Sequence, residues 1–171
     1  MADKAYHIEK MTEKDVEEAV ALISRAMNAA ESKWAKRTMS YHFKCMSIGM
    51  DDGRDYFVWR STNRILGLVG LHRYLWGPEQ NVWLSWFAVE PTVQRQGHGS
   101  ALLKAIESVA LDHGCRKFYV ETYAHITFAN AREFYASQGF SEVGRISNYL
   151  EDGSDMIVYG KELKSNMSHL L

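Results

Sequence analysis

The chain has 171 residues, of which 46% are hydrophobic, and a formal net charge of -1 at pH 7. This length suits a single domain with a core of its own, and the nearly balanced charge argues against nucleic acid as a partner. The charged opening residues lack the apolar stretch of a signal peptide, and no segment reaches the roughly 20 apolar residues of a membrane helix. We therefore expect a cytoplasmic protein with no membrane partner, whose two cysteines, Cys45 and Cys115, stay reduced.

Hydrophobic periodicity and turn residues divide the chain into helices and strands. Thr12 and Asp15 form the pattern of a capping box at the start of the first helix, and Gly114 and Gly139 stand where later helices end. In the first half, the expected elements are a strand at 6–10, a helix from 12 to about 29, an irregular helix at 31–49, and strands at 56–60, 65–74 and 81–89. In the second half, they are a helix after residue 99 that stops at 114, a strand at 117–123, a helix at 129–138, and a hairpin of 140–149 with 156–163.

The order of these elements, β-α-α-β-β-β-α-β-α-β-β, predicts a single layered α/β domain. Antiparallel strands come first, and a β-α-β crossover over 82–123 then places two strands parallel. We expect a mixed, mostly antiparallel sheet with helices on both faces, a core at about 6–163 and a tail at 164–171.

The segment VEPTVQRQGHGSALL, residues 89–103, joins a strand to a helix through Gly97 and Gly99. Such a turn offers free backbone N–H groups to an anion at the positive end of the helix dipole. The dinucleotide fingerprint G-x-G-x-x-G is incomplete here, and the Gly-Lys-Ser/Thr of a nucleotide hydrolase loop lacks its lysine. The residues therefore exclude these two nucleotide-binding classes.

The pattern Gln94-x-x-Gly97-x-Gly99 resembles the acyl-coenzyme A pyrophosphate loop of the GNAT N-acyltransferase superfamily. A second segment, residues 130–135 followed by Gly139 and Phe140, is similar to another conserved block of that family and comes after the next strand, as expected. The resemblance covers about 6–163. It implies a GNAT-like fold and an enzyme that transfers an acetyl group directly from acetyl-CoA to an amine in a ternary complex, with no metal.

The resemblance also implies where the cofactor binds. In the family, the pantetheine arm pairs with the backbone of a strand that splays from its neighbour, and the pyrophosphate rests on amides at the glycine turn, where the helix dipole adds to the attraction. The residues implied are Phe87, Ala88, Val89, Gln94, Arg95, Gln96, Gly97, His98, Gly99, Ser100, Asn130 and Tyr135. Arg95, His98 and Lys104 also suit a solvated helix start, and Asn130 also suits a helix cap.

Tyr135 matches the catalytic tyrosine that the family places at the departing sulfur. A phenol of pKa ~10 is a weaker acid than a thiol of pKa ~8.5, so full proton transfer is uphill by roughly 2 kcal/mol and a hydrogen bond to the thiolate suffices. The attacking amine must also lose a proton. Glu121, Glu90 and His72 lie near the expected splay, and no motif fixes any of them. Glu121 is the preferred base, with a strand-edge ion pair as its structural alternative, whereas His72 suits a structural role.

The resemblance implies an acceptor pocket built from the first helices and the strand ends. Because the chain has five tryptophans, we expect aromatic side chains to line this pocket. The expected acceptor contacts are Trp34, Trp86 and Tyr123, each of which can instead pack in the core. The leading hypothesis is an N-acetyltransferase of a small-molecule amine. A peptide or protein N-acetyltransferase and a non-catalytic coenzyme A sensor remain open, as does a homodimer.

Overall fold

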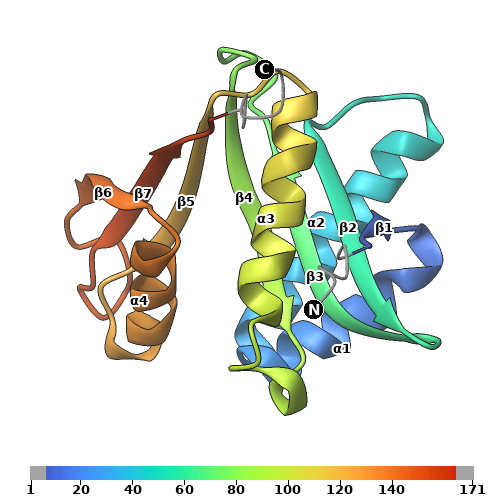
Figure 1. Ribbon diagram of the computed structural model, residues 1–171, viewed down its shortest axis with the longest axis horizontal. Coiled ribbons are helices and arrows are strands. Elements are labelled where there is room, and N and C mark those ends of the chain that lie inside the picture. Colours follow the sequence, from blue (N-terminus) through green and yellow to red (C-terminus); the bar gives the residue numbers. More distant parts are fainter. Residues whose placement is uncertain (1–6, 165–171) are drawn as a thin grey trace, which may run out of the picture.

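A seven-stranded sheet organises the chain. In the computed structural model, which describes residues 7–164, the strands lie in the order β1-β2-β3-β4-β5-β7-β6 (Figure 1). The strands are β1 (Glu9–Lys10), β2 (Arg54–Ser61), β3 (Arg64–His72), β4 (Asn81–Val89), β5 (Lys117–Tyr123), β6 (Ser141–Ile146) and β7 (Met156–Glu162). Neighbours are antiparallel except β4 and β5, which are parallel. The predicted mixed sheet with one β-α-β crossover is thus confirmed.

Helices cover both faces of this sheet, as predicted. The α-helices are α1 (Val16–Ala26), α2 (Ala29–Ser47), α3 (His98–Asp112) and α4 (Ala129–Ser137), with 3-10 turns at Glu13–Asp15, Pro91–Val93 and Ile126–Phe128. Helices α1 and α2 pack on one face, and α3 and α4 on the other (Figure 1). Over residues 7–164, every helix is too short or too polar to cross a bilayer.

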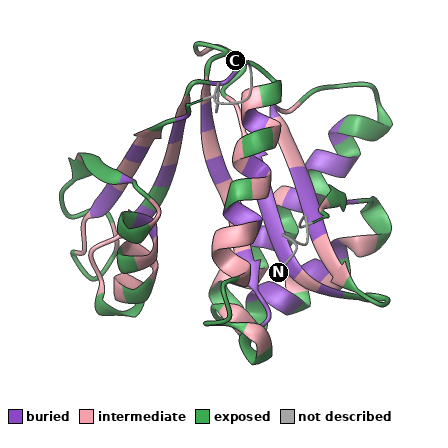
Figure 2. Ribbon diagram, viewed as in Figure 1, coloured by how far each residue is buried: buried purple, intermediate pink, exposed green. Residues whose placement is uncertain are grey.

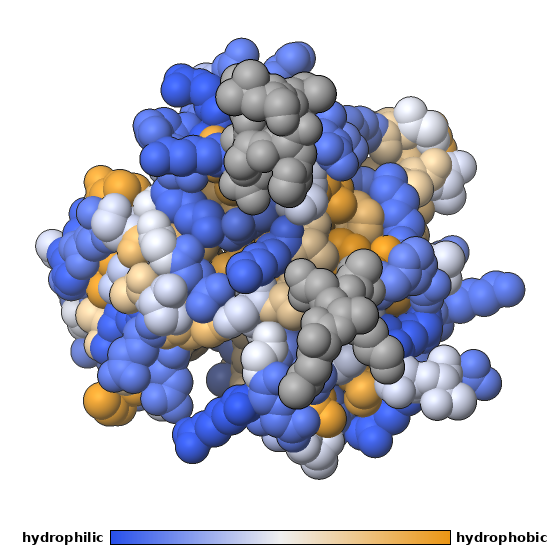
Figure 3. Space-filling view, in the orientation of Figure 1, coloured by the Kyte–Doolittle hydropathy of each residue, from blue (hydrophilic) through white to orange (hydrophobic). Residues whose placement is uncertain are grey.

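Each face of the sheet has its own apolar core. Leu102 and Ile106 of α3 pack with Phe118 of β5 on one face, and Leu22 and Met39 pack with the strands on the other. Figure 2 shows the buried positions on the inner sides of the helices and along the central strands, where apolar side chains are removed from water. The two cysteines are free and buried, as expected. On the face seen in Figure 3, hydrophobic residues are scattered among hydrophilic ones.

The N-terminal elements differ from the prediction at their boundaries. Strand β1 is shorter than the expected 6–10, and the expected position Tyr6 lies outside the described residues. The capping box is present, because the Thr12 backbone N–H donates to the Asp15 carboxylate at 2.8 Å, but it starts a 3-10 turn that leads into α1. Helix α1 then ends early, since Asn28 caps α2 by accepting from the Glu31 backbone N–H at 2.8 Å.

The second helix is regular, contrary to the prediction. Its buried positions Ala35, Met39 and Phe43 recur every four residues, so one stripe faces the sheet along most of the helix. Exposed aromatic and methionine side chains on the outer face obscured this stripe in the sequence. The predicted bounds of β4 and β5 are confirmed, and the ends of the other strands shift by a few residues.

Strands β4 and β5 pair over only part of their length. The parallel register joins Asn81 to Lys117, Val82 to Phe118 and Trp83 to Tyr119, and no pairing follows. Beyond these positions the two strands separate, as Figure 1 shows. Strand β4 also carries a bulge against β3, because its register advances from Leu84 to Phe87 while β3 moves from Leu71 to Val69.

Candidate active site

A cavity of about 320 Å³ lies where β4 and β5 separate. Side chains alternate between the two faces of a strand, so the lining residues can be assigned to one face or the other. Those on the face of α3 and α4 include Phe87, Thr122 and Tyr135. Those on the face of α1 and α2 include Trp86, Glu121 and Tyr123. Because residues of both faces line it, the cavity passes through the sheet at the gap.

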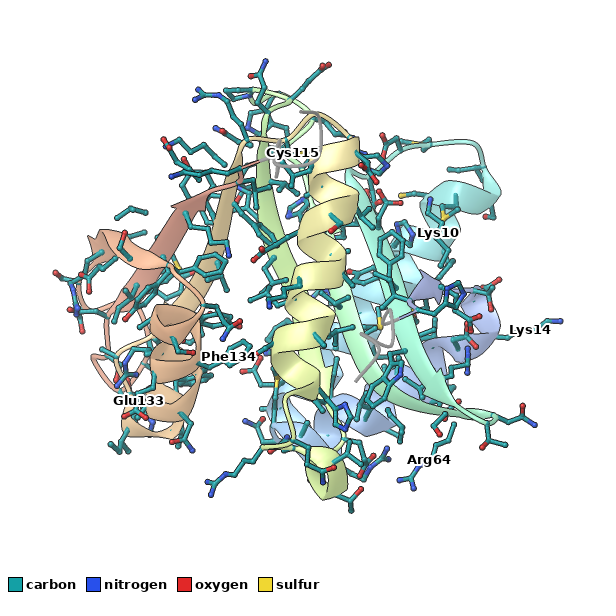
Figure 4. All side chains as sticks on the ribbon, viewed as in Figure 1. Lys10, Lys14, Arg64, Cys115, Glu133 and Phe134 are labelled. Carbon is teal, nitrogen blue, oxygen red and sulfur yellow. The ribbon has the colours of Figure 1, made fainter. Side chains whose placement is uncertain are left out.

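The two glycines at the start of α3 differ in backbone conformation and in surroundings. Gly97 has φ +85°, a left-handed conformation that favours glycine, and a Cβ there would meet no atom within 4 Å. Gly99 has no such conformation, but a Cβ there would lie 3.4 Å from the Phe134 ring. Figure 4 shows Phe134 between α4 and α3. Gly97 therefore shapes the turn, whereas at Gly99 a Cβ would make only an ordinary van der Waals contact, so neither the backbone conformation nor the packing requires glycine there.

The turn before α3 is exposed and tied to the end of β4. The Gln94 side-chain amide donates to the Val89 carbonyl at 2.8 Å, which holds the turn against the strand. Residues 94–97 are exposed, and the first backbone N–H groups of α3, at 98–100, have no acceptor within the helix. The predicted positions 94–100 thus form one turn, exposed over 94–97, that follows the end of β4 and leads into α3. This arrangement can receive an anionic group.

The basic side chains near this turn have separate environments. Arg95 and Lys104 are exposed. The His98 ring stacks on Trp59 of β2, with the ring centroids 4.7 Å apart. His98 thus packs against the sheet, and the two exposed cations are the ones able to meet a ligand's negative charge.

Tyr135 lies on α4, where its side chain is 8% exposed and lines the cavity. Its ring packs edge-on against Phe134 and Phe140, with centroids 5.6 and 5.8 Å away. Burial raises the pKa of the Tyr135 phenol above its usual value near 10. The phenol therefore stays protonated at neutral pH and can donate a hydrogen bond into the cavity.

Asn130 does not cap α4, contrary to one of its two expected roles. It is the second residue of the helix and exposed, and the preceding turn leaves Phe128 at the cap position without a side-chain hydrogen bond. Sequence reasoning missed Arg132, which instead orders this region. Its guanidinium donates to the carbonyls of Tyr123 at 2.5 Å and His125 at 3.0 Å, so it ties α4 to the end of β5.

The three candidate bases lie in different environments. Glu121 lines the cavity, and desolvation by the surrounding wall raises the pKa of its carboxyl group. Glu90 lies outside the cavity lining, with its side chain 3% exposed, and its carboxylate contacts Arg25 at 2.7 Å and Arg64 at 3.2 Å. This pairing corrects the expectation that Glu90 faces the reacting groups. The two guanidinium groups hold it as a structural anion.

His72 also lines the cavity. Burial, with a smaller contribution from the Arg54 charge, lowers the pKa of His72 to about 4. The ring is therefore neutral at pH 7, which agrees with the structural role expected for it.

The expected acceptor contacts are only partly brought together. Trp86 and Tyr123 line the cavity, and the Trp86 indole N–H donates to the Thr38 hydroxyl at 2.7 Å, which fixes its ring against α2. Trp34 lies outside the lining and is 53% exposed, because it stands on the outer side of α2. Sequence reasoning missed Glu31 and Tyr74, which the Asn28 cap and the end of β3 bring to the cavity.

The chain belongs to the GNAT family of acetyltransferases. The family model described as "Acetyltransferase (GNAT) family" matches residues 17–140, which include the glycine turn and Tyr135. The cofactor of this family is acetyl-CoA, as the sequence resemblance implied. No curated protein sequence matches the chain.

Solved structures share the fold at low identity. A putative GNAT acetyltransferase from Desulfovibrio desulfuricans is 20% identical and superposes with a TM-score of 0.82, over 92% of this chain and 99% of that one. The ribosomal-protein-S18-alanine N-acetyltransferase from Escherichia coli is 22% identical, with a TM-score of 0.72 over 96% and 98% of the two chains. A GNAT acetyltransferase from Elizabethkingia anophelis, solved with acetyl-CoA bound, is 18% identical, with a TM-score of 0.68 over 94% and 100%.

Proposed function

We propose that the protein is an N-acetyltransferase that acetylates the primary amine of a small molecule by direct transfer within a ternary complex. The observation that carries this proposal is the cavity through the sheet. Tyr135 lines it on the face of α3 and α4, and Glu121 lines it on the opposite face with aromatic side chains. A cofactor arm and an acceptor can thus approach from opposite faces and meet in the gap.

The residues present fit acetyl-CoA. Beyond Trp83, β4 has no strand partner on its β5 side, so its backbone groups there are available to an extended ligand. Among residues 7–164, the buried Thr122 hydroxyl in the cavity wall has no hydrogen-bond partner, which is unusual for a buried polar group. Residues 87–89 would hold the pantetheine arm. The turn at 94–97 and the amides at 98–100 would hold the pyrophosphate.

The cofactor supplies the acetyl thioester when bound, and this chain's side chains perform the proton and charge chemistry. Tyr135 donates a hydrogen bond where charge develops on the departing sulfur. Glu121 accepts the proton that the acceptor's ammonium group must lose before its nitrogen can attack. At pH 7 that loss costs an unassisted amine of pKa ~10.4 roughly 4.6 kcal/mol, so a base at this position contributes directly to the rate.

The cavity size supports a small acceptor. Its volume lies near the lower end of the roughly 300–1,000 Å³ typical of small-molecule sites. Several elements contribute to its wall: Met27 and Thr38 line it from the side of α1 and α2, and Tyr74 lines it from the segment after β3. A peptide acceptor would need a continuous open groove instead. The Escherichia coli relative of similar fold acts on a ribosomal protein, so peptides belong in the same test.

The test begins with thermal unfolding of the purified protein with and without acetyl-CoA. At about 100 times the dissociation constant, binding adds roughly 2.7 kcal/mol, which raises the unfolding temperature by roughly 5 to 10 °C at this size. Thiol release is then measured with panels of small amines and of peptides. No thermal shift would refute the proposal. A shift without thiol release from either panel would instead support a coenzyme A sensor, and release with peptides alone a peptide acetyltransferase.

A further inference from the structure

Two carboxylates line the acceptor side of the cavity without a cation to balance them. Glu31 comes from the first turn of α2, and Glu121 comes from β5 beside the gap. Within residues 7–164, neither side chain forms an ion pair or accepts a hydrogen bond from another side chain. Glu31 is half-buried and Glu121 is exposed at the cavity wall, so both carboxylates are open to a ligand that supplies positive charge.

The other titratable side chains of the lining do not compensate this charge. Arg54 lines the cavity, but its guanidinium donates to the Asp52 carboxylate at 3.2 Å, so its charge is already paired. His72 is neutral because burial lowers its pKa to about 4. Desolvation also raises the pKa of both Glu31 and Glu121, which means that their ionised forms lack stabilisation in the ligand-free cavity.

Aromatic rings line the same cavity as the two carboxylates. Tyr123 lies within electrostatic reach of both, because the pKa of its phenol is raised first by burial and then by the charges of Tyr149, Glu121 and Glu31. The other aromatic rings of the lining on this side are Tyr74, Trp83, Trp86 and Phe128. Ammonium groups bind to aromatic faces as well as to carboxylates, so this wall suits a chain that is cationic at both ends and apolar between them.

A polar atom in the cavity wall lies on the face of the sheet opposite to the two carboxylates. The Thr122 side chain is 3% exposed, and its hydroxyl has no partner in the described residues although Thr122 lines the cavity. A buried hydroxyl normally has a hydrogen-bond partner, and here the cavity is the place from which one can come. Thr122 neighbours Glu121 on β5 but faces the opposite side of the sheet. The hydroxyl therefore belongs to the cofactor side of the cavity, and the two carboxylates and the aromatic rings define the acceptor side.

We infer that the acceptor is a small aliphatic diamine or polyamine, bound with one ammonium group at Glu121 and a second at Glu31. This inference rests on the proposed acetyltransferase function. In the transfer, the ammonium at Glu121 gives up a proton to that carboxylate and its nitrogen forms the amide bond. The carbon–sulfur bond breaks, and the thiolate leaves with the electron pair near Tyr135. The ammonium at Glu31 stays charged and anchors the other end of the chain.

Two other amine classes fit the cavity less well. An amino acid would bring a carboxylate into a space where two carboxylates are already unbalanced, and the cation that could meet it, Arg54, is paired with Asp52. A long apolar monoamine would use one carboxylate and leave the other desolvated without a partner. A diamine satisfies both.

The experiment compares amines of equal length with the wild-type protein and acetyl-CoA. Putrescine, n-butylamine and γ-aminobutyrate share a four-carbon chain and differ in the group opposite the reacting amine, and cadaverine with n-pentylamine repeats the comparison at greater length. We expect kcat/KM for the better diamine to exceed that of its monoamine by at least about tenfold, the effect of one charged hydrogen-bonded contact. γ-Aminobutyrate should be the poorest acceptor.

The variant Glu31→Gln identifies the second anchor. It should lower kcat/KM for the diamine by a larger factor than for n-butylamine, and so remove most of the diamine's advantage. Glu13→Gln is the control, because Glu13 is exposed in the turn before α1 and outside the cavity lining, and it should change neither rate. Equal turnover of diamine and monoamine, or an equal loss of both in Glu31→Gln, would overturn the inference while leaving the acetyltransferase proposal intact.

Calorimetric titration covers the case in which acetyl-CoA binds but none of these amines is acetylated. Each diamine and its monoamine are titrated into the protein saturated with coenzyme A. Diamine binding at least about tenfold tighter than that of the monoamine supports the inference. Equal or absent binding overturns it. A protein that does not bind acetyl-CoA at all fails the thermal-shift test instead, which marks a failure of the proposed function.

Discussion

Lys161 of β7 and Glu107 of α3 form an ion pair that links α3 to the C-terminal strands, with Nζ and Oε1 2.5 Å apart. Both side chains are largely buried, at 16% and 17% exposed. The Lys161 ammonium also donates to the Gln138 carbonyl at the end of α4 and lies 5.0 Å from the centre of the Phe140 ring. This ammonium therefore links α3 both to β7 and to the end of α4.

Replacing Lys161 by methionine should destabilise the protein by about 3 kcal/mol, because it leaves the Glu107 carboxylate buried without its cation. The measurement is the free energy of unfolding in urea. The double variant Lys161→Met, Glu107→Leu should recover most of the loss, since an apolar pair of similar size needs no ionic partner. The single variant Glu107→Leu completes the cycle, and a loss in the double variant equal to the sum of the two single losses would show that the two residues are not coupled.

The ion pair of Lys117 and Glu162 provides a matched surface control. It has a similar contact distance, 2.7 Å, but its side chains are 30% and 62% exposed. Lys117→Met should cost less than about 1 kcal/mol, because exposed pairs contribute little. A loss as large as that of Lys161→Met would mean that burial is not the cause of the difference.

The variant Tyr135→Phe tests whether the Tyr135 hydroxyl donates a hydrogen bond to the departing sulfur. Removing the hydroxyl should lower kcat by roughly 100-fold, the effect of losing a positioned hydrogen-bond or proton donor, and leave acetyl-CoA affinity nearly unchanged. Burial raises the pKa of this phenol, so its deprotonation should add no alkaline limb to the wild-type rate profile below pH 10. A large loss of acetyl-CoA affinity in the variant would assign Tyr135 to cofactor binding instead.

The regular elements could be predicted because their signals are local. Strand β4 is an apolar run that stops at Pro91, and Gly114 separates α3 from β5, so the bounds of both strands follow from the sequence. The break between α1 and α2 was also signalled locally, by the Asn28 cap, but helical residues on both sides of it masked the signal. The two glycines could be noticed in the sequence, but only the structure shows that Gly97 has a left-handed φ and that Gly99 does not.

The site could be predicted only where a motif fixed it. Tyr135 and the glycine turn belong to such motifs, and the structure has Tyr135 in the cavity lining and the turn between β4 and α3. Glu90 and Trp34 were chosen because they stand near strand ends and on the first helices. The sequence does not show that Arg25 and Arg64 enclose Glu90, or that Trp34 lies on the outer side of α2. These outcomes depend on contacts between distant segments, which no local pattern records.

His72 should make the protein less stable as the pH falls. The pKa of His72 is about 4 in the folded protein against 6.5 for an ordinary histidine, so between these values the unfolded chain binds a proton that the folded protein does not. The contribution of His72 to the free energy of unfolding is fully present above pH 6.5 and is lost as the pH falls toward 4. In His72→Gln, the unfolding temperature should therefore fall less between pH 7 and pH 5 than in the wild type. Parallel curves for the two proteins would contradict the buried, neutral state.

Glu121→Gln should change the shape of the rate profile as well as its height. In the wild type, the acceptor enters as an ammonium and Glu121 takes its proton, so kcat/KM should reach a plateau once that carboxyl group has ionised. Desolvation raises the pKa of Glu121, which moves the start of the plateau above the range of an ordinary glutamate.

In the variant only the unprotonated amine reacts, about one molecule in 2,500 at pH 7, so kcat/KM should rise with pH toward the pKa of the amine. At pH 7 the loss should be roughly 100-fold, and it should shrink as the pH rises. Profiles of the same shape would show that the proton leaves by another route and that Glu121 acts only in binding.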